Sequence, residues 1–162
     1  MSKIKLSILL LISFFIISCS NHQADQNKQK YSLAYIGGEF DGLLLKNYLI
    51  SSLKNLNIYD QDSNFEIKAS INHNSNIYIT NIDNTSNREE IKTILSSEII
   101  DARLNCSVFN DEINVSQFYI YVSGNKFLSN KAAQKKIKKD NTELVVRQFI
   151  NKIKNIDHEC YE

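Results

Sequence analysis

The side chains that could carry covalent or acid–base chemistry are few and widely spaced in this sequence. There are three cysteines and three histidines. His22 lies in a polar N-terminal stretch, His73 in a predicted turn and His158 in the C-terminal tail, so none can be placed beside a nucleophile. The sequence also lacks the G-x-S-x-G, H-E-x-x-H, C-x-x-C and Walker A motifs. We therefore expect no catalytic residue, no metal site and no cofactor, and we predict that the protein is not an enzyme.

Cys19 has the most informative surroundings. A short positive segment, Met1–Lys5, precedes an apolar run over residues 6–17, which falls short of the roughly 20 apolar residues of a transmembrane helix. This layout is typical of a secretory signal peptide. Residues 16–19 (Ile-Ile-Ser-Cys) resemble a bacterial lipobox, in which the cysteine is acylated, with palmitate for example, and becomes the mature N-terminus. We favour this over ordinary secretory cleavage, and two or three acyl chains would hold the protein firmly on a membrane.

The chain then divides into three parts. Residues 1–18 form the cleaved signal peptide, 19–30 a polar lipidated tether and 31–162 a single domain. A composition of 43% hydrophobic and 23% charged residues indicates a globular domain. Loss of Lys3 and Lys5 with the signal peptide lowers the formal net charge from +1 to about −1. Such a charge argues against a broad basic surface, so we expect no nucleic-acid partner.

Cys106 and Cys160 are the two cysteines left in the domain. In an oxidising compartment they can form a disulfide that pins the C-terminal tail to the sheet. The alternative is a small buried Cys106 and a free thiol at Cys160. We slightly favour the alternative, because nothing in the sequence fixes the distance between them.

Hydrophobic periodicity defines the first half of the domain. Tyr31, Leu33 and Tyr35 alternate, which predicts a strand with these side chains on one face. Four leucines at helical spacing predict a helix that buries one side on a sheet. The predicted elements are a strand over 31–36, a helix over 42–56 with Asp41 as N-cap, a strand over 65–71, a turn over 73–76, an extended segment over 77–80 and a loop over 81–88.

The second half begins with an ambiguous segment, residues 89–109. Its start fits a helix by spacing, but its end alternates apolar and polar residues, so we predict one long strand. A turn over 110–112 and a strand over 113–122 would complete a hairpin. The last predicted helix covers 131–156 and is capped by Ser129 or Asn130. Its expected buried stripe consists of Ile137, Leu144, Val145, Gln148, Phe149, Ile153 and Ile156.

A lysine-rich run over 135–139 lies in that last helix. It could contact a membrane or lipid, but we favour a solvated helix face. Together the elements predict an α+β fold, in which a three- to five-stranded, mostly antiparallel sheet carries two helices packed on one face.

This arrangement resembles the lipopolysaccharide-assembly lipoprotein LptE family, in its shorter alphaproteobacterial form. The residues that carry the resemblance are the helix Leu43–Leu56 with Asn57-Ile58 after it, residues 65–69, Asn87-Arg88, residues 129–133 and residues 145–150. The resemblance implies an outer-membrane lipoprotein on the periplasmic face, which plugs the LptD β-barrel, helps it to assemble and binds lipopolysaccharide. Ser20 after the lipid-bearing cysteine also fits outer-membrane sorting. The sequence lacks the proline-rich entry common in larger members of the family.

Binding of an anionic lipid head would need cations near a strand end or loop. Arg88 and Lys92 beside the 81–88 loop are the candidate lipopolysaccharide contacts, with Lys126 as a weaker one. Ordinary solvated charges are the alternative for all three. Two other functions remain open: an auxiliary periplasmic lipoprotein of an envelope transporter or cell-wall synthase, and a surface antigen.

Overall fold

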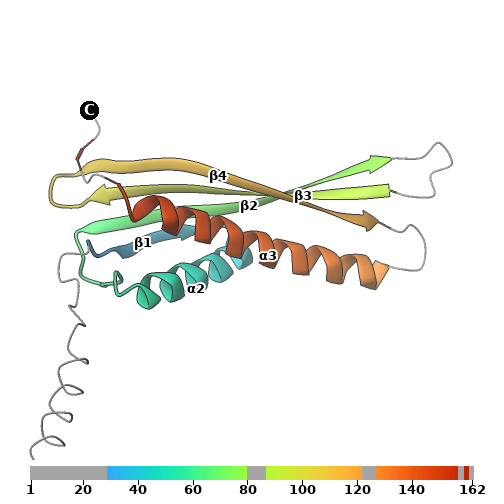
Figure 1. The fold of residues 1–162 in the computed structure, drawn as a ribbon, viewed down its shortest axis with the longest axis horizontal. Coiled ribbons are helices and arrows are strands. Elements are labelled where there is room, and N and C mark those ends of the chain that lie inside the picture. The colour runs from blue at the N-terminus through green and yellow to red at the C-terminus, as the bar shows by residue number, and fades with distance from the viewer. Residues whose placement is uncertain (1–28, 80–86, 122–126, 157–158, 161–162) are drawn as a thin grey trace, which may run out of the picture.

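The computed structural model describes residues 29–79, 87–121, 127–156 and 159–160. In chain order its elements are β1 (Ser32–Gly37), α2 (Glu39–Asn55), β2 (Phe65–Ile79), β3 (Asn87–Asp101), β4 (Cys106–Tyr121) and α3 (Phe127–Ile153). The strands form one open sheet in the order β1-β2-β3-β4. β1 pairs with β2 in parallel and the other pairs are antiparallel. Both helices cover one face of the sheet, which confirms the predicted α+β fold (Figure 1).

The core lies between the sheet and the two helices. Leu45, Leu49 and Leu53 recur every fourth residue along α2 and are completely buried. Val145, Phe149 and Ile153 recur at the same spacing along α3, with at most 1% of each residue exposed. The strands supply alternate residues to the same core, because successive side chains point to opposite faces. Those of β2 and β3 are Phe65, Ile67, Ala69, Ile71, Leu95 and Ile99.

The two ends of the sheet differ in how they are covered. β1 pairs only with residues 66–70 of β2, and α2 packs beside it on β1 and β2. Beyond this point β2, β3 and β4 continue, and α3 runs along them (Figure 1). We call the end with β1 and α2 the proximal half and the remainder the distal half. In the distal half the only helical cover among the described residues is the N-terminal part of α3.

The turn predicted over residues 73–76 is wrong. β2 is continuous, and each of its residues from Phe65 to Ile79 is paired with β3. His73 faces the helices, where its Nδ1 lies 2.7 Å from the hydroxyl of Thr93. Pairing along a long neighbouring strand therefore overrides the local turn preference of the Asn and Ser residues here.

The β3–β4 hairpin was predicted, but its turn was placed several residues too late. β3 ends at Asp101 and β4 begins at Cys106, so the expected turn over 110–112 lies inside β4. The Asp101 carboxylate accepts a hydrogen bond from the backbone N–H of Arg103 at 2.9 Å, and Asn105 has a φ of 51°. An aspartate that folds back on its own backbone and an asparagine in the left-handed region both favour a turn.

Both helices begin earlier than predicted. α2 starts at Glu39 after Gly38, which has a φ of 112° and makes no side-chain cap, so Asp41 is not the N-cap. A Cβ at Gly38 would lie 2.7 Å from the carbonyl oxygen of Ile71, so the sheet itself requires glycine there. α3 starts at Phe127, which places the predicted caps Ser129 and Asn130 within the helix.

Two side chains face the opposite way from the prediction. Tyr35 is 62% exposed, although Tyr31 is buried, because a shift in register between Leu33 and Tyr35 breaks the alternation of β1. Gln148 is exposed, and Asn141 and Thr142 take buried positions on α3 instead.

Candidate functional site

Arg88 and Lys92, the two cations predicted to contact lipid, both lie on β3 and face away from the helices. Arg88 is paired with Tyr78 on one side and Ile120 on the other, and it is exposed. Lys92 lies between Asn74 and Ser116 and is half-buried. The two are four residues apart, or about 13 Å along an extended strand. The third candidate, Lys126, lies outside the described residues, as does Cys19.

Exposed apolar side chains surround Arg88. Tyr78, Phe118 and Ile120 are 46%, 57% and 67% exposed, and the rings of Tyr78 and Phe118 are 6.1 Å apart. The hydroxyl of Tyr78 donates to Glu90 at 2.8 Å. Hydrogen bonds from Ser116 and Tyr78 lower the pKa of Glu90, so this carboxylate stays charged beside Arg88. We call this amphipathic surface, made of Tyr78, Arg88, Glu90, Lys92, Phe118 and Ile120, the open-face patch.

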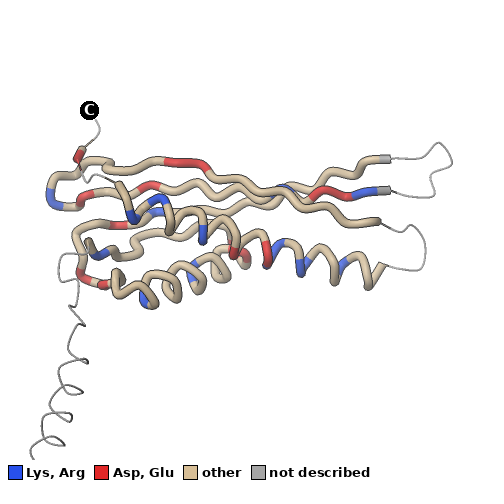
Figure 2. The backbone as a smooth tube through the Cα atoms, in the orientation of Figure 1, with Lys and Arg blue, Asp and Glu red and all other residues tan. Residues whose placement is uncertain are grey.

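A second candidate site lies on the helical side, where the start of α2 meets the N-terminal half of α3. A groove of about 740 Å³ is lined there by Phe40, Asp41, Leu44, Lys131, Ala132, Gln134, Lys135, Lys138 and Lys139. We call it the lysine groove. Figure 2 shows Lys and Arg recurring along this part of α3. The sequence favours a solvated helix face for the run 135–139 over a membrane contact, because that is the commoner role of such a charge run. The structure places the start of α2 beside this run.

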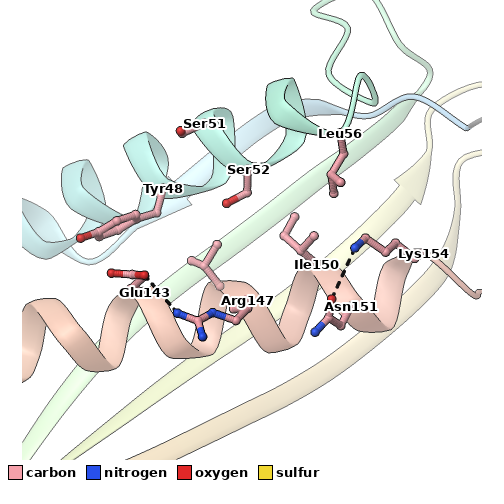
Figure 3. A pocket seen from close by; sticks show the side chains of 10 residues that line it. Tyr48, Ser51, Ser52, Leu56, Glu143, Arg147, Ile150, Asn151 and Lys154 are labelled. Carbon is pink, nitrogen blue, oxygen red and sulfur yellow. Dashed lines mark hydrogen bonds and ion pairs between the residues drawn. The ribbon is translucent and has the colours of Figure 1, made fainter. Parts of the chain in front are cut away.

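A smaller groove of about 270 Å³ lies between the same helices in the proximal half (Figure 3). Its charged and amide groups contact each other. Arg147 donates to Glu143 at 3.1 Å, and Lys154 lies 3.5 Å from the side-chain oxygen of Asn151. Because these groups already pair with near neighbours in the chain, this groove offers less free charge to a ligand than the lysine groove.

Glu89 forms a buried polar centre beneath the N-terminal half of α3. Only 2% of this residue is exposed. Its carboxylate accepts hydrogen bonds from Ser75 of β2, Tyr119 of β4 and Gln134 of α3, the last at 2.7 Å. A buried carboxylate needs such donors, since an unpaired charge would be very costly to desolvate. Glu89 therefore joins three strands to α3, a role that the sequence analysis did not predict.

His73 occupies a second buried polar position. Its side chain is 2% exposed, and its Nε2 lies 3.7 Å from Asp41, which is itself 3.9 Å from Lys138. Burial lowers the pKa of His73, with an opposing effect from Asp41 and a smaller lowering by Lys138. In the part of the chain that the structure describes, no group of three or more His, Cys, Asp or Glu side chains could hold a metal ion.

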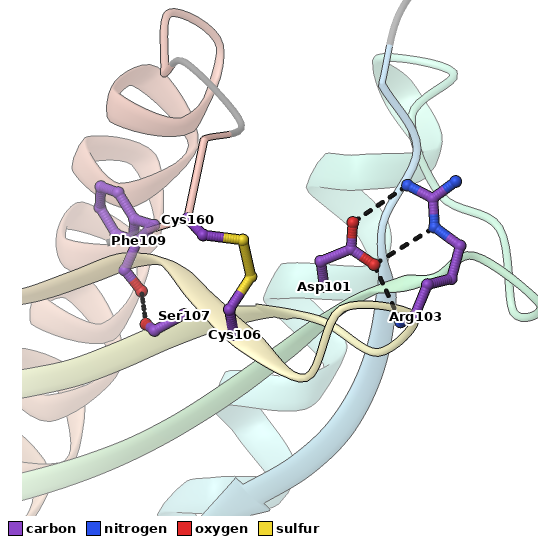
Figure 4. The surroundings of a disulfide bond; sticks show 6 residues. All are labelled: Asp101, Arg103, Cys106, Ser107, Phe109 and Cys160. Carbon is purple, nitrogen blue, oxygen red and sulfur yellow. Dashed lines mark hydrogen bonds and ion pairs between the residues drawn. A yellow bond between two sulfur atoms is a disulfide. The ribbon is translucent and has the colours of Figure 1, made fainter. Parts of the chain in front are cut away.

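Cys106 and Cys160 form a disulfide, with their Cα atoms 5.7 Å apart (Figure 4). The sequence left the pairing of these cysteines open and slightly favoured a buried Cys106 with a free thiol at Cys160. The structure has the disulfide instead. The bond attaches the C-terminal tail to the first residue of β4. In the adjoining turn Arg103 contacts the buried Asp101 at 3.0 Å and lowers its pKa.

Within the described ranges, neither α2 nor α3 is long and apolar enough to cross a bilayer.

Comparison with known proteins found similarity at the level of structure. No family model matches the sequence, and no curated protein matches it. Rare lipoprotein B from Shewanella oneidensis aligns over 77% of this chain and 93% of its own, with a TM-score of 0.64 and 9% identity. A minor lipoprotein from Acinetobacter baumannii aligns over 78% and 91%, with a TM-score of 0.59 and 12% identity.

A third solved structure, the uncharacterized lipoprotein B from Nitrosomonas europaea, aligns over 78% of this chain and 82% of its own. Its TM-score is 0.58 and its identity 15%. All three proteins are bacterial lipoproteins by name. At these identities the likeness shows a shared fold.

Proposed function

We propose that the protein is an outer-membrane lipoprotein of the LptE type, anchored through acylated Cys19 on the periplasmic face. In this role it plugs the LptD β-barrel, helps the barrel to assemble and takes part in lipopolysaccharide transport to the cell surface. The observation that carries the proposal is the likeness to solved bacterial lipoproteins over 77–78% of the chain, because it joins a lipoprotein fold to a lipobox cysteine. A lipoprotein role also agrees with the signal peptide expected over residues 1–18.

The open-face patch supplies the proposed lipopolysaccharide contact. Arg88 and Lys92 present two cations on one face, and Tyr78, Phe118 and Ile120 offer apolar surface beside them. Lipopolysaccharide carries anionic groups next to acyl chains, so a surface with both features suits it. Lys126 stays a further candidate. We assign the protein a binding and assembly role rather than a catalytic one.

The test is affinity purification of the tagged, lipidated protein from its own membranes in mild detergent. We expect one stoichiometric partner, a large β-barrel that resists SDS until it is boiled. If transporter subunits of the inner membrane or a cell-wall synthase are purified instead, the barrel role is wrong and the auxiliary-lipoprotein function takes its place.

Cys19→Ala is the matched control for the anchor. Without the thiol we expect the precursor to stay unprocessed and unlipidated. If a mature-sized Cys19→Ala protein still partitions into the detergent phase, the proposed lipid anchor is wrong, whatever partner is purified.

A further inference from the structure

Large apolar side chains are exposed on the first turns of both helices. Phe40 and Leu43 of α2 are 91% and 62% exposed, and Phe127 and Leu128 of α3 are 64% and 81% exposed. These residues do not belong to the open-face patch, which lies on the other face of the sheet. Soluble surfaces seldom gather large apolar groups in this way without a binding role.

The lysine groove lies among these apolar residues and carries an excess of positive charge. Four of its lining residues are lysines, and Asp41 is the one carboxylate among them. Lys138 lies 3.9 Å from Asp41, and Lys131 lies over the ring of Phe127 at 5.2 Å. Lys135 and Lys139 are exposed and have no ion-pair partner among the described residues. The groove therefore keeps most of its positive charge available to an external anion.

The chemistry of the groove suits phosphate headgroups. Lysine binds phosphate as a point charge on a flexible stem, which does not require the fixed geometry that the planar fork of arginine imposes. The groove is lined by lysine alone among the basic residues. Exposed aromatic and aliphatic groups beside lysines are typical of helices that lie in the interface of an anionic membrane.

The tether can bring this surface to the membrane that holds the anchor. The hydroxyl of Tyr31 donates to the carbonyl oxygen of Ile153, so the domain begins beside the C-terminal end of α3. From there Lys131 is about 33 Å along the helix axis. Residues 20–30 span up to about 38 Å when extended. The groove therefore lies within reach of the bilayer when α3 is parallel to it.

We propose that the lysine groove and the exposed Phe40, Leu43, Phe127 and Leu128 dock on the anionic phospholipid surface to which the chain is anchored. The inference goes beyond the barrel role and rests only on the proposed lipid anchor at Cys19. It gives the domain a membrane-bound orientation before any partner protein is engaged.

The sequence offers a direct test, because it contains no tryptophan. Phe40→Trp places a single fluorophore at the groove, on a side chain exposed enough to tolerate it. The lipidated variant is reconstituted in phosphatidylcholine vesicles with and without phosphatidylglycerol. We expect a blue-shifted emission, quenched by brominated acyl chains, in the anionic vesicles and its loss at high salt. The matched control Tyr35→Trp, at a side chain that is 62% exposed on the other face of the sheet and outside the open-face patch, should show neither effect.

Charge reversal separates the groove from general electrostatics. Lys135→Glu with Lys139→Glu in the Phe40→Trp background should abolish the shift, since each lysine near an anionic surface changes the ratio of docked to undocked protein about fivefold. Lys68→Glu with Lys154→Glu, both outside the lysine groove and the open-face patch, changes net charge equally and should leave the shift in place.

Three results would overturn the proposal. One is an unchanged Phe40→Trp spectrum in anionic vesicles, and another is an equal loss of the shift in the control charge variant. The third is shielding of the fluorophore only when a barrel protein is added, which would make the groove a protein interface. In each of these cases flotation shows which claim is wrong: if the protein still floats with neutral vesicles, the anchor is sound and only the docking proposal has failed. If it does not float, the anchor itself is wrong.

Discussion

At the scale of single residues, His73 is a titratable group whose side chain is almost completely buried. It is enclosed by β2, Thr93 of β3 and Asp41 of α2, with Lys138 of α3 beyond. Its pKa lies below the ordinary value of 6.5 because burial disfavours the imidazolium. The unfolded chain therefore binds a proton more readily than the folded protein between the two pKa values.

The folded protein should lose stability as the pH falls through about 6.5, since the unfolded state then takes up protons in preference. The loss should level off once the pH is below the lowered pKa of His73. His73→Gln, which keeps a polar side chain but does not titrate, should remove this part of the pH dependence. Urea unfolding midpoints of both proteins, from about pH 7.5 to about pH 5, measure this pH dependence of stability. Parallel curves for the two proteins would assign the effect to other groups.

Arg88 and Lys92 carry a second residue-scale prediction. Replacing either by glutamate should weaken lipopolysaccharide binding by roughly fivefold, because an exposed charge contact contributes up to about 1 kcal/mol. Lys68 lies on β2, on the same face of the sheet as Arg88 and Lys92. Lys68→Glu is therefore the control, and it should have little effect on lipopolysaccharide binding. A photocrosslinking amino acid in place of Phe118 reports the change as the yield of crosslinks to purified lipopolysaccharide. Equal losses in all three variants would indicate general electrostatic attraction rather than a site.

The sequence predicted a strand at Lys92, but it placed Arg88 in the preceding loop, whereas β3 already begins at Asn87. It also did not predict the cross-strand neighbours of the two cations. Arg88 gains Tyr78 and Ile120 only through the register of three strands. Register depends on pairings that are distant in sequence, so the open-face patch could not be assembled from local patterns.

At the scale of elements, the N-terminal half of α3 depends on one buried carboxylate. Its apolar positions are sparse, and Lys residues cover its outer face. Glu89 compensates by accepting hydrogen bonds from Ser75, Tyr119 and Gln134. The position of this helix half, and hence of the lysine groove, therefore follows from a polar contact.

Glu89→Ala should lower the free energy of unfolding by about 2–4 kcal/mol, because it removes the buried acceptor of three partly buried hydrogen bonds. The loss should appear first as faster hydrogen exchange in α3 around Gln134. Glu143→Ala removes only an exposed pair with Arg147 and should cost less than about 0.5 kcal/mol. Equal effects of the two changes would contradict the assigned role of Glu89.

Element types were largely predictable, whereas boundaries were not. The alternation over 65–71 and the leucine spacing of α2 gave the correct types, because both patterns arise from burial on one face. The β3–β4 turn was missed because Ala102 and Leu104 continue the apolar alternation although both are exposed. Asn141 and Thr142 were missed because buried polar residues carry no periodic signal.

At the scale of the whole molecule, the disulfide joins residues separated by 54 positions. The loop of chain that the disulfide closes contains all of α3. Loss of the bond should therefore release the tail and increase the number of conformations open to the unfolded chain. Cys106→Ser with Cys160→Ser should lower the free energy of unfolding by about 3–4 kcal/mol. In the protein without substitutions, thermal unfolding with and without reductant measures the stability that the disulfide contributes. An unchanged melting temperature under reduction would show that the bond adds no stability.

The parallel pairing of β1 has a consequence for the order in which the molecule folds. β2, β3 and β4 form a meander of sequential neighbours, whereas β1 must wait for α2 and the start of β2 before it can pair. Contacts between sequential strands close shorter loops and should form faster. We expect amides of the meander to be protected before those of β1 in pulse-labelled hydrogen exchange. The strand that follows the proposed lipid anchor would then join the sheet last, after the remainder has taken its shape.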